Sequence, residues 1–267
     1  MNNFWLVIRE QIEYSNVIFR ITKYEIKALY EGHRLGIAWE IINPLLQILT
    51  FYVIFGIGFR QEREVGDVPF IAWLIIGKAI WFYLNGCIQR ASNSVKRKLS
   101  MASKMKFPLS ILPTITIVSR LNGLFVMIGV GMLIAIFSGL FPTFYWLQII
   151  YYFIAMIVLV FAISLFTSTV AILFLDFDFI LSTIMRFMMF TSGVIIPLEP
   201  LRGRLGAVMR LSPFFYIISG FRNSLLYGVS MFDRGPETLM FWSFTLLVGI
   251  IGAHLHLKYR NRFSDYV

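Results

Sequence analysis

Positively charged side chains inside long apolar stretches are the residues of this sequence best suited to bind a ligand. Lys78 lies about 13 Å along the apolar stretch 69–88. Arg186 lies within the fifth apolar stretch, and Arg120 lies either within the third stretch or at its inner boundary. A cation in hydrocarbon costs at least about 2.5–3.5 kcal/mol on insertion scales, so it should face water, an opposite charge or an anionic ligand. Because no acidic residue occurs at matching depth in the other stretches, these three cations predict a path for an anionic ligand.

Three aromatic residues accompany Lys78 in its stretch, namely Trp73, Trp81 and Phe82. Their flat surfaces can stack against the rings or hydroxylated chains of a ligand. The alternative is that Lys78 reaches outward to a lipid headgroup layer and that the aromatic rings only pack in the interior. The sequence leaves both interpretations open.

A second group of cations lies in the segment 197–231, which holds Arg202, Arg204, Arg210 and Arg222. Guanidinium groups bind phosphate through paired N–H donors better than an ammonium group does. Ser212-Pro213 predicts a helix start in this segment, and its free N–H groups also favour an anion. We expect these arginines to contact either outer lipid headgroups or a departing anionic polymer, in which case the segment is an outer gate.

Residues for acid–base or metal chemistry are few. The histidines are His33, His254 and His256. His254 and His256 are two residues apart and therefore do not share a helix face. No metal site is predicted. Asp176 and Asp178 resemble paired catalytic carboxylates, but they more readily cap a turn. We expect no catalytic residue and no metal or other cofactor bound by this chain.

The sequence also lacks the pattern G-x-x-x-x-G-K-[ST], whose backbone N–H groups surround nucleotide phosphates. Gly77-Lys78 is followed by alanine inside an apolar stretch. If ATP drives this protein, ATP and Mg²⁺ are therefore bound by a separate chain.

Composition places the chain among integral membrane proteins. Of 267 residues, 58% are hydrophobic and 14% are charged, roughly half the charge of a soluble domain. The apolar stretches predict five spans within 35–196 and a sixth at 237–257. We expect one all-α transmembrane domain, residues 1–267, without a disulfide because Cys87 is the single cysteine.

Basic residues indicate how the chain is oriented. Five lie in the segment 1–34, six in the loop 90–106 and three in the tail 258–267, whereas the loop 60–68 holds two. The positive-inside rule therefore predicts a multi-pass protein of the plasma membrane with both termini in the cytoplasm.

The segment 197–231 is the exception, since it lies outside in this topology yet is basic. Its halves, 201–211 and 214–227, are apolar but too short to cross a bilayer. They predict a re-entrant helical hairpin that enters the membrane from its outer face, where protein or water surrounds it.

The segment 1–34 shows helical periodicity. Polar residues recur from Arg20 to Glu31 on one face, and the other face holds Tyr14, Val17, Ile18, Ile21, Tyr24 and Ala28. This pattern predicts an amphipathic helix in the cytoplasmic headgroup layer. Docking of a cytoplasmic partner is the alternative use of the same helix.

Three motifs give the chain a recognisable pattern. YEGHRLGIAWEIINPLLQ, SKMKFPLSILPT and LSPFFYIISGFRNSLLYG, in this order and spacing, resemble the permeases of polysaccharide-exporting ABC transporters over nearly the whole chain. Two further stretches, GDVPFIAWLIIG and HLHLKYRNRFSDYV, are most similar to the membrane subunits of bacterial wall teichoic acid exporters.

This resemblance implies a homodimer of six-span subunits with two ATP-binding cassette subunits on separate chains. It also implies export of an undecaprenyl-diphosphate-linked polymer of polyol phosphates in a Gram-positive bacterium. The chain would then form the membrane channel of an ATP-driven translocase without being an enzyme on its own. We expect no nucleic acid among its partners.

The basic loop is the expected contact with the ATPase subunit, together with the N-terminal helix. Methionines interleaved with cations suit a protein groove better than lipid. The residues are Lys96, Arg97, Lys98, Met101, Lys104, Met105 and Lys106. Positive charge facing anionic lipid is the alternative.

Three other functions remain open at this point. The chain is an ABC permease for another lipid-linked polysaccharide, an ABC permease for small amphiphiles such as drugs or haem, or a membrane glycosyltransferase or phosphotransferase. A transferase needs acidic or histidine groups facing a cleft, and this sequence offers few.

Overall fold

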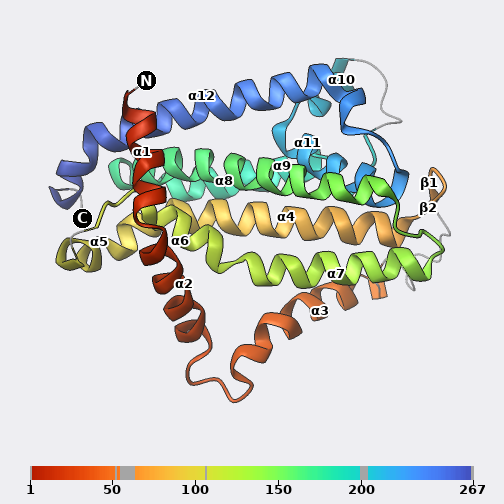
Figure 1. Cartoon of the computed structure of the whole chain (residues 1–267), viewed down its shortest axis with the longest axis horizontal. Coiled ribbons are helices and arrows are strands. Elements are labelled where there is room, and N and C mark those ends of the chain that lie inside the picture. The colour runs from red at the N-terminus through yellow and green to blue at the C-terminus, as the bar shows by residue number, and fades with distance from the viewer. Residues whose placement is uncertain (1, 52, 55–63, 106, 199–203, 266–267) are drawn as a thin grey trace.

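The chain is almost entirely helical in a computed structural model that describes residues 2–51, 53–54, 64–105, 107–198 and 204–265. Its long helices run side by side in Figure 1, namely α4 (Phe70–Ser92), α7 (Leu121–Phe137), α8 (Gln148–Leu173) and α12 (Gly235–Tyr259). Both ends of the described chain and α5 (Ser94–Met105) lie at one end of this bundle. A small hairpin of β1 (Glu64–Val65) and β2 (Val68–Pro69) lies at the opposite end.

Four described stretches are long and apolar enough to cross a membrane. They are Phe70–Ser92, Ile111–Phe137, Phe144–Leu173 and Met231–Phe263. They coincide with the second, third, fourth and sixth predicted spans, so helices of the predicted length and apolarity are confirmed at these four places. Helix α8 alone has 26 residues and is about 39 Å long, more than the hydrocarbon thickness of about 30 Å.

The other two predicted spans do not reach this length within the described residues. In the first, 35–59, a 3₁₀ turn (η1, Gly36–Ala38) leads into α3 (Trp39–Phe51), which contains Pro44, and most of the remainder lies outside the described residues. The fifth is α9 (Phe177–Thr191) with 15 residues, about 22 Å and shorter than the hydrocarbon layer. Six spans therefore stay a prediction.

The third span is not one continuous helix, because it breaks at Arg120. Helix α6 (Ile111–Ser119) ends there, and α7 follows at once. The Ser119 hydroxyl donates to the Thr116 carbonyl oxygen (2.9 Å), and the Thr116 hydroxyl donates to that of Leu112 (3.3 Å). Such side chains compete with backbone N–H groups for helical carbonyls and weaken the last turn of α6. Arg120 thus lies at a helix junction.

Helix α4 is the centre of the core. In its apolar segment 78% of the residues are buried, whereas in the segments that contain α7 and α12 only 28% of the residues are buried. Glycines allow neighbouring helices to approach closely. A Cβ on Gly220 of α11 (Pro213–Arg222) would lie 2.2 Å from the Tyr152 ring of α8, and one on Gly252 of α12 would lie 2.9 Å from the Phe166 nitrogen.

The N-terminal segment forms two helices rather than one, α1 (Asn2–Glu13) and α2 (Ser15–Tyr30). Helix α1 runs across the long helices, whereas α2 passes α6 and extends away from the bundle (Figure 1). In α1, Val7 packs with Leu165 of α8 and Ala253 of α12. The Arg260 guanidinium donates to the Glu10 carboxylate at 3.1 Å. The first helix of the chain is therefore held by the last one.

Helix α2 is amphipathic as predicted, but its apolar side packs on protein. Ile18 and Ile21 are buried with Ile111 and Ile115 of α6, whereas Tyr24 is 67% exposed. The predicted apolar face is therefore divided between the protein interior and the surface.

The segment 197–231 contains the predicted pair of short helices. They are α10 (Arg204–Arg210) and α11, which continues as a π-helical turn, η4 (Asn223–Tyr227). Ser212 is extended and Pro213 is the first residue of α11, as expected of a helix start. The Tyr227 hydroxyl donates to the Val65 carbonyl oxygen (2.8 Å) and so joins this segment to the β-hairpin. Whether the pair enters the membrane stays a prediction.

Arg222, at the end of α11, is 3% exposed. Its guanidinium donates to the carbonyl oxygens of Trp73 (3.0 Å), Gly193 (2.6 Å) and Val194 (2.9 Å). Its central carbon lies 3.4 Å from the centre of the Trp73 ring. These contacts satisfy a charge that is costly to bury. They tie α11 to α4 and to the residues that follow α9.

We expect Arg222→Lys to destabilise the protein although it keeps the charge. An ammonium group cannot reach three carbonyl oxygens in one plane, and unpaired buried groups cost about 2–4 kcal/mol in total. Thermal unfolding of the purified protein in detergent measures the loss. Arg204→Lys, at an exposed position, is the matched control and should unfold like the wild type. Equal unfolding temperatures for both variants would contradict the anchoring role of Arg222.

Candidate functional site

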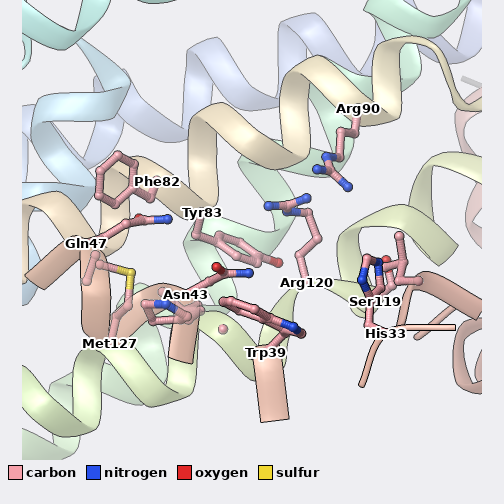
Figure 2. Close-up of a pocket in the computed structure, with 15 residues that line it drawn as sticks. His33, Trp39, Asn43, Gln47, Phe82, Tyr83, Arg90, Ser119, Arg120 and Met127 are labelled. Carbon is pink, nitrogen blue, oxygen red and sulfur yellow. The ribbon is translucent and has the colours of Figure 1, made fainter. Parts of the chain in front are cut away.

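A cavity of about 610 Å³ lies between α3, α4 and the α6–α7 junction (Figure 2). Helix α4 contributes Phe82, Tyr83 and Arg90 to its wall, and the junction contributes Ser119 and Arg120. Leu29 and His33 close it on the side of α2. The cavity thus brings together residues far apart in the sequence.

The polar end of the cavity is cationic. Arg90 from α4 and Arg120 from the junction point toward one another in Figure 2, with His33 and Ser119 nearby. Among the described lining residues none is an aspartate or a glutamate. Two guanidinium groups from different elements therefore line this end of the cavity.

Local structure sets the position of Arg120. Its guanidinium lies against α4 at Gly86, where an added Cβ would be 3.2 Å from the Arg120 Nε. Beside it, the Tyr83 hydroxyl donates to the Ile117 carbonyl oxygen (3.2 Å) and joins α4 to α6. The glycine and the tyrosine together let an arginine at a helix junction face Arg90.

Helix α3 forms the opposite wall with Trp39, Asn43 and Gln47. These residues are four apart and so lie on one helix face. Leu124 and Met127 of α7 complete the wall with apolar side chains. The cavity is thus amphiphilic, with guanidinium groups at one end and apolar and amide groups at the other.

A second cavity, of about 360 Å³, adjoins the first and shares Leu29, Arg90, Ser119 and Arg120 with it. It adds Arg97 and Lys98 of α5. Lys98 forms an ion pair with Glu25 of α2. A band of basic residues therefore runs from α5 to the larger cavity.

Lys78 does not line this cavity. It is 4% exposed, its Nζ lies 3.7 Å from the Met189 sulfur of α9, and it lies 5.5 Å from the centre of the Phe82 ring. The predicted contact with an anionic ligand is therefore not visible in the single chain, where the lysine is held between α4 and α9.

The predicted aromatic surfaces are mostly core residues. Trp73 is 1% exposed and stacks on Phe70 and on the Arg222 guanidinium. Trp81 is 2% exposed and meets Phe214 edge to face. The packing interpretation fits both tryptophans, because their rings are covered within one chain. Phe82 alone of the three lines the cavity.

The predicted path residues are thus divided. Phe82 and Arg120 line the cavity, whereas Arg186 is exposed on α9. In the sequence, Arg90 belongs to the basic loop 90–106, and no local pattern indicates that it faces Arg120. The wall formed by α3 does have a signal in the sequence, because Trp39, Asn43 and Gln47 are four residues apart and so share one helix face.

The outer arginines also differ from one another. Arg222 is bound by internal carbonyl oxygens, which corrects the expectation that it needs an external anion. Arg204 is exposed, and the Arg210 Nε donates to the Gly206 carbonyl oxygen (3.2 Å). For these two, lipid headgroups and a polymer both remain possible contacts. Arg202 lies outside the described residues.

Part of the predicted coupling surface can be placed. Lys96, Arg97 and Lys98 lie on α5, with Arg97 exposed. The side chains of Met101, Lys104 and Met105, and the whole of Lys106, lie outside the described part of the chain.

Three of the remaining acid–base candidates, Asp178, His254 and His256, have hydrogen-bond partners. The Asn93 amide donates to the Asp178 carboxylate (2.7 Å), which joins α9 to the α4–α5 corner. Asp176 occupies the N-cap position of α9, but its side chain forms no capping hydrogen bond there. His256 lies 3.2 Å from the Thr169 hydroxyl, and His254 lies 3.4 Å from the Asn3 amide. Within the described ranges no three His, Cys, Asp or Glu residues gather to hold a metal.

Comparison with known proteins gives a consistent result. Residues 16–226 match the model of a protein family described as ABC-2 type transporter. The O-antigen export system permease protein RfbA of Myxococcus xanthus is 22% identical over 234 residues, which cover 86% of this chain and 87% of that protein. RfbA of Klebsiella pneumoniae is 23% identical and covers 92% of both chains. The polysialic acid transport protein KpsM of Escherichia coli is 21% identical over 89% of this chain and 90% of its own length.

Proposed function

Because the chain belongs to the ABC-2 type transporter family, we propose that it is the membrane subunit of an ATP-driven exporter of a lipid-linked polysaccharide. The family match over residues 16–226 carries this proposal. It is supported by relatives of nearly equal length whose names state O-antigen export and polysialic acid transport. The four membrane-crossing stretches and the cationic cavity suit a protein that handles an anionic amphiphile.

The proposed cargo is wall teichoic acid linked to undecaprenyl diphosphate. Its support is the resemblance of GDVPFIAWLIIG and HLHLKYRNRFSDYV to teichoic acid exporters, together with the cations that face Phe82 and the cavity. Export of another lipid-linked polysaccharide is the second candidate, and the names of the relatives favour it.

The proposed assembly is a homodimer with two ATP-binding cassette subunits, which bind ATP and Mg²⁺. The absence of a phosphate-binding loop from the sequence agrees with a separate ATPase chain. We place both termini and α5 in the cytoplasm, because the basic residues gather at the end of the bundle that holds them. ATP would close the partner subunits, and their motion would open a channel between the two copies.

Reconstituted vesicles test this function. The chain is co-purified with its ATPase partner, and transport of lipid-linked teichoic acid, lipid-linked O-antigen and a small amphiphilic dye is compared. We expect ATP-dependent transport of the teichoic acid and little of the dye. Preference for O-antigen would leave the family function intact and exclude teichoic acid. Transfer of sugar or phosphate by the chain without ATPase would instead indicate a transferase.

Coupling to the ATPase should depend on the ion pair between Lys98 of α5 and Glu25 of α2. Both side chains are largely covered, with exposures of 21% and 25%, so the pair joins two helices of the proposed contact surface. Lys98→Glu should separate the helices by like-charge repulsion and lower export per ATP hydrolysed. The exchanged pair Glu25→Lys with Lys98→Glu restores attraction and should recover coupling. Failure of the exchange to recover it, with normal membrane insertion, would count against this link.

Lys78 is the proposed cation of the translocation path, beside Met189 and Phe82. Lys78→Met keeps the length of the side chain and removes the charge, so packing should be preserved while export falls several-fold. Arg262→Met, at an exposed position near the end of the chain, is the control for loss of one positive charge. Export by Lys78→Met at the wild-type rate, with equal expression, would show that the charge is not on the path.

A further inference from the structure

The segment that follows α12 is packed into the protein. Residues Arg260–Asp265 form a 3₁₀ helix, η6, and its Phe263 is 0% exposed. Residues near a chain end are ordered only where packing holds them. Phe263 belongs to an apolar cluster at the end of the bundle where α5 and both ends of the described chain lie (Figure 1). Its other members include Ile18 and Ile21 of α2, Val95 of α5, Phe107, Ile111 of α6 and Ile172 of α8.

This cluster reaches both ends of α5. Val95 is the second residue of α5 and is 0% exposed. Phe107 comes two residues after the end of α5 and is 9% exposed. Because side chains in a protein interior are closely packed, a displacement of one member is transmitted to its neighbours. The interior that fixes the position of α5 is therefore shared with η6.

A polar connection joins η6 to the start of α6. The Arg260 guanidinium donates to one oxygen of the Glu10 carboxylate (3.1 Å). The Ser110 hydroxyl donates to the other oxygen, and Ser110 directly precedes α6. Hydrogen bonds to a charged group are stronger than neutral ones. Helix α1, which carries Glu10, thus links the first residue of η6 to the corner between α5 and α6.

Phe263 also contacts the long helices. Its ring centre lies 5.4 Å from that of His256 of α12, edge to face. The His256 Nδ1 lies 3.2 Å from the Thr169 hydroxyl of α8. Helices α12 and α8 approach closely at Gly252, where a Cβ would lie 2.9 Å from the Phe166 nitrogen. A displacement of Phe263 is therefore felt by α12 and, through it, by α8.

We propose that Phe263 is a positioning residue that links α5 to α12, so that a movement of α5 during the ATPase cycle is passed to the sixth predicted span. The polypeptide itself connects α5 to α4 and α6, whereas α12 is distant in the sequence. Packing of η6 supplies the missing connection. The coupling role rests on the proposed function, in which α5 contacts the ATPase subunit. The positioning of α5 rests on the cluster alone.

Hydrogen–deuterium exchange tests the positioning in nanodiscs that hold the transporter with its ATPase partner. Phe263→Ala leaves a cavity in the cluster, so amides of α5 should exchange several-fold faster than in the wild type. Helix α7, described in full, contributes no residue to the cluster and should exchange unchanged. Phe137→Ala, at a position 88% exposed, is the matched control. Wild-type exchange of α5 in Phe263→Ala would overturn the proposal.

Export per ATP hydrolysed tests the coupling. Phe263→Ala should still co-purify with the ATPase and hydrolyse ATP, but its export per ATP should fall several-fold. Phe263→Met conserves most of the side-chain volume and should recover most of the coupling. A purely structural role would lower the amount of assembled transporter and leave export per ATP unchanged, and that result would contradict the link.

Two milder variants keep the test decisive if Phe263→Ala does not assemble. Phe263→Leu leaves a smaller cavity, and Arg260→Gln weakens the contact with Glu10 without a change in the cluster. Each should speed exchange of α5 and lower export per ATP by a smaller factor. Wild-type values of both quantities in both variants would also overturn the proposal.

The two measurements separate this link from the proposed function. If the wild type exports no polysaccharide, the proposed function fails, whereas faster exchange of α5 in Phe263→Ala still supports the positioning role. If the wild type exports and Phe263→Ala exports equally well per ATP, the function stands and the coupling role of Phe263 is overturned.

Discussion

The Arg222 guanidinium stays in the apolar interior only because three carbonyl oxygens and the Trp73 ring surround it. Two of these oxygens, from Gly193 and Val194, are available because α9 has already ended at Thr191. The third is supplied by α4, where Gly77 leaves the room, since a Cβ there would lie 1.9 Å from the guanidinium. The end of α9, the position of α11 and the central place of α4 therefore depend on one another.

The same physical rule separates the other cations of the apolar stretches. A charge in a membrane protein must find partners inside the protein or be met by a ligand. Arg222 has internal carbonyl oxygens, and Lys78 lies between a methionine sulfur and a phenyl ring. Arg90 and Arg120 line one cavity together with polar and apolar side chains from other helices. Residue type alone does not distinguish these cases, because the distinction depends on which groups from distant helices surround the charge.

This explains how far the sequence predicts the structure. The four apolar helices are predictable because their signal is the length and composition of single stretches. The helix start at Ser212-Pro213 is predictable because these two residue types favour the first positions of a helix. At Arg120, the hydroxyl groups of Thr116 and Ser119 bond to backbone carbonyl oxygens and weaken the end of α6. The mean hydropathy of the stretch does not reveal such a break. The burial of Trp73 and Trp81 depends on Arg222 and Phe214, more than a hundred positions away. The cavity likewise needs α3, α4 and the α6–α7 junction together, and no single window of sequence contains it.

The contact between α1 and α12 has a consequence for synthesis. Val7 packs on Ala253, and Glu10 accepts a hydrogen bond from Arg260, so the docking surface of α1 includes residues that are synthesised after α4, α7 and α8. Helix α1 therefore cannot complete these contacts until residues 253–260 have been synthesised. Docking of α1 is therefore a late step of biogenesis, and a prematurely terminated chain keeps this helix unattached and exposed to quality-control proteases.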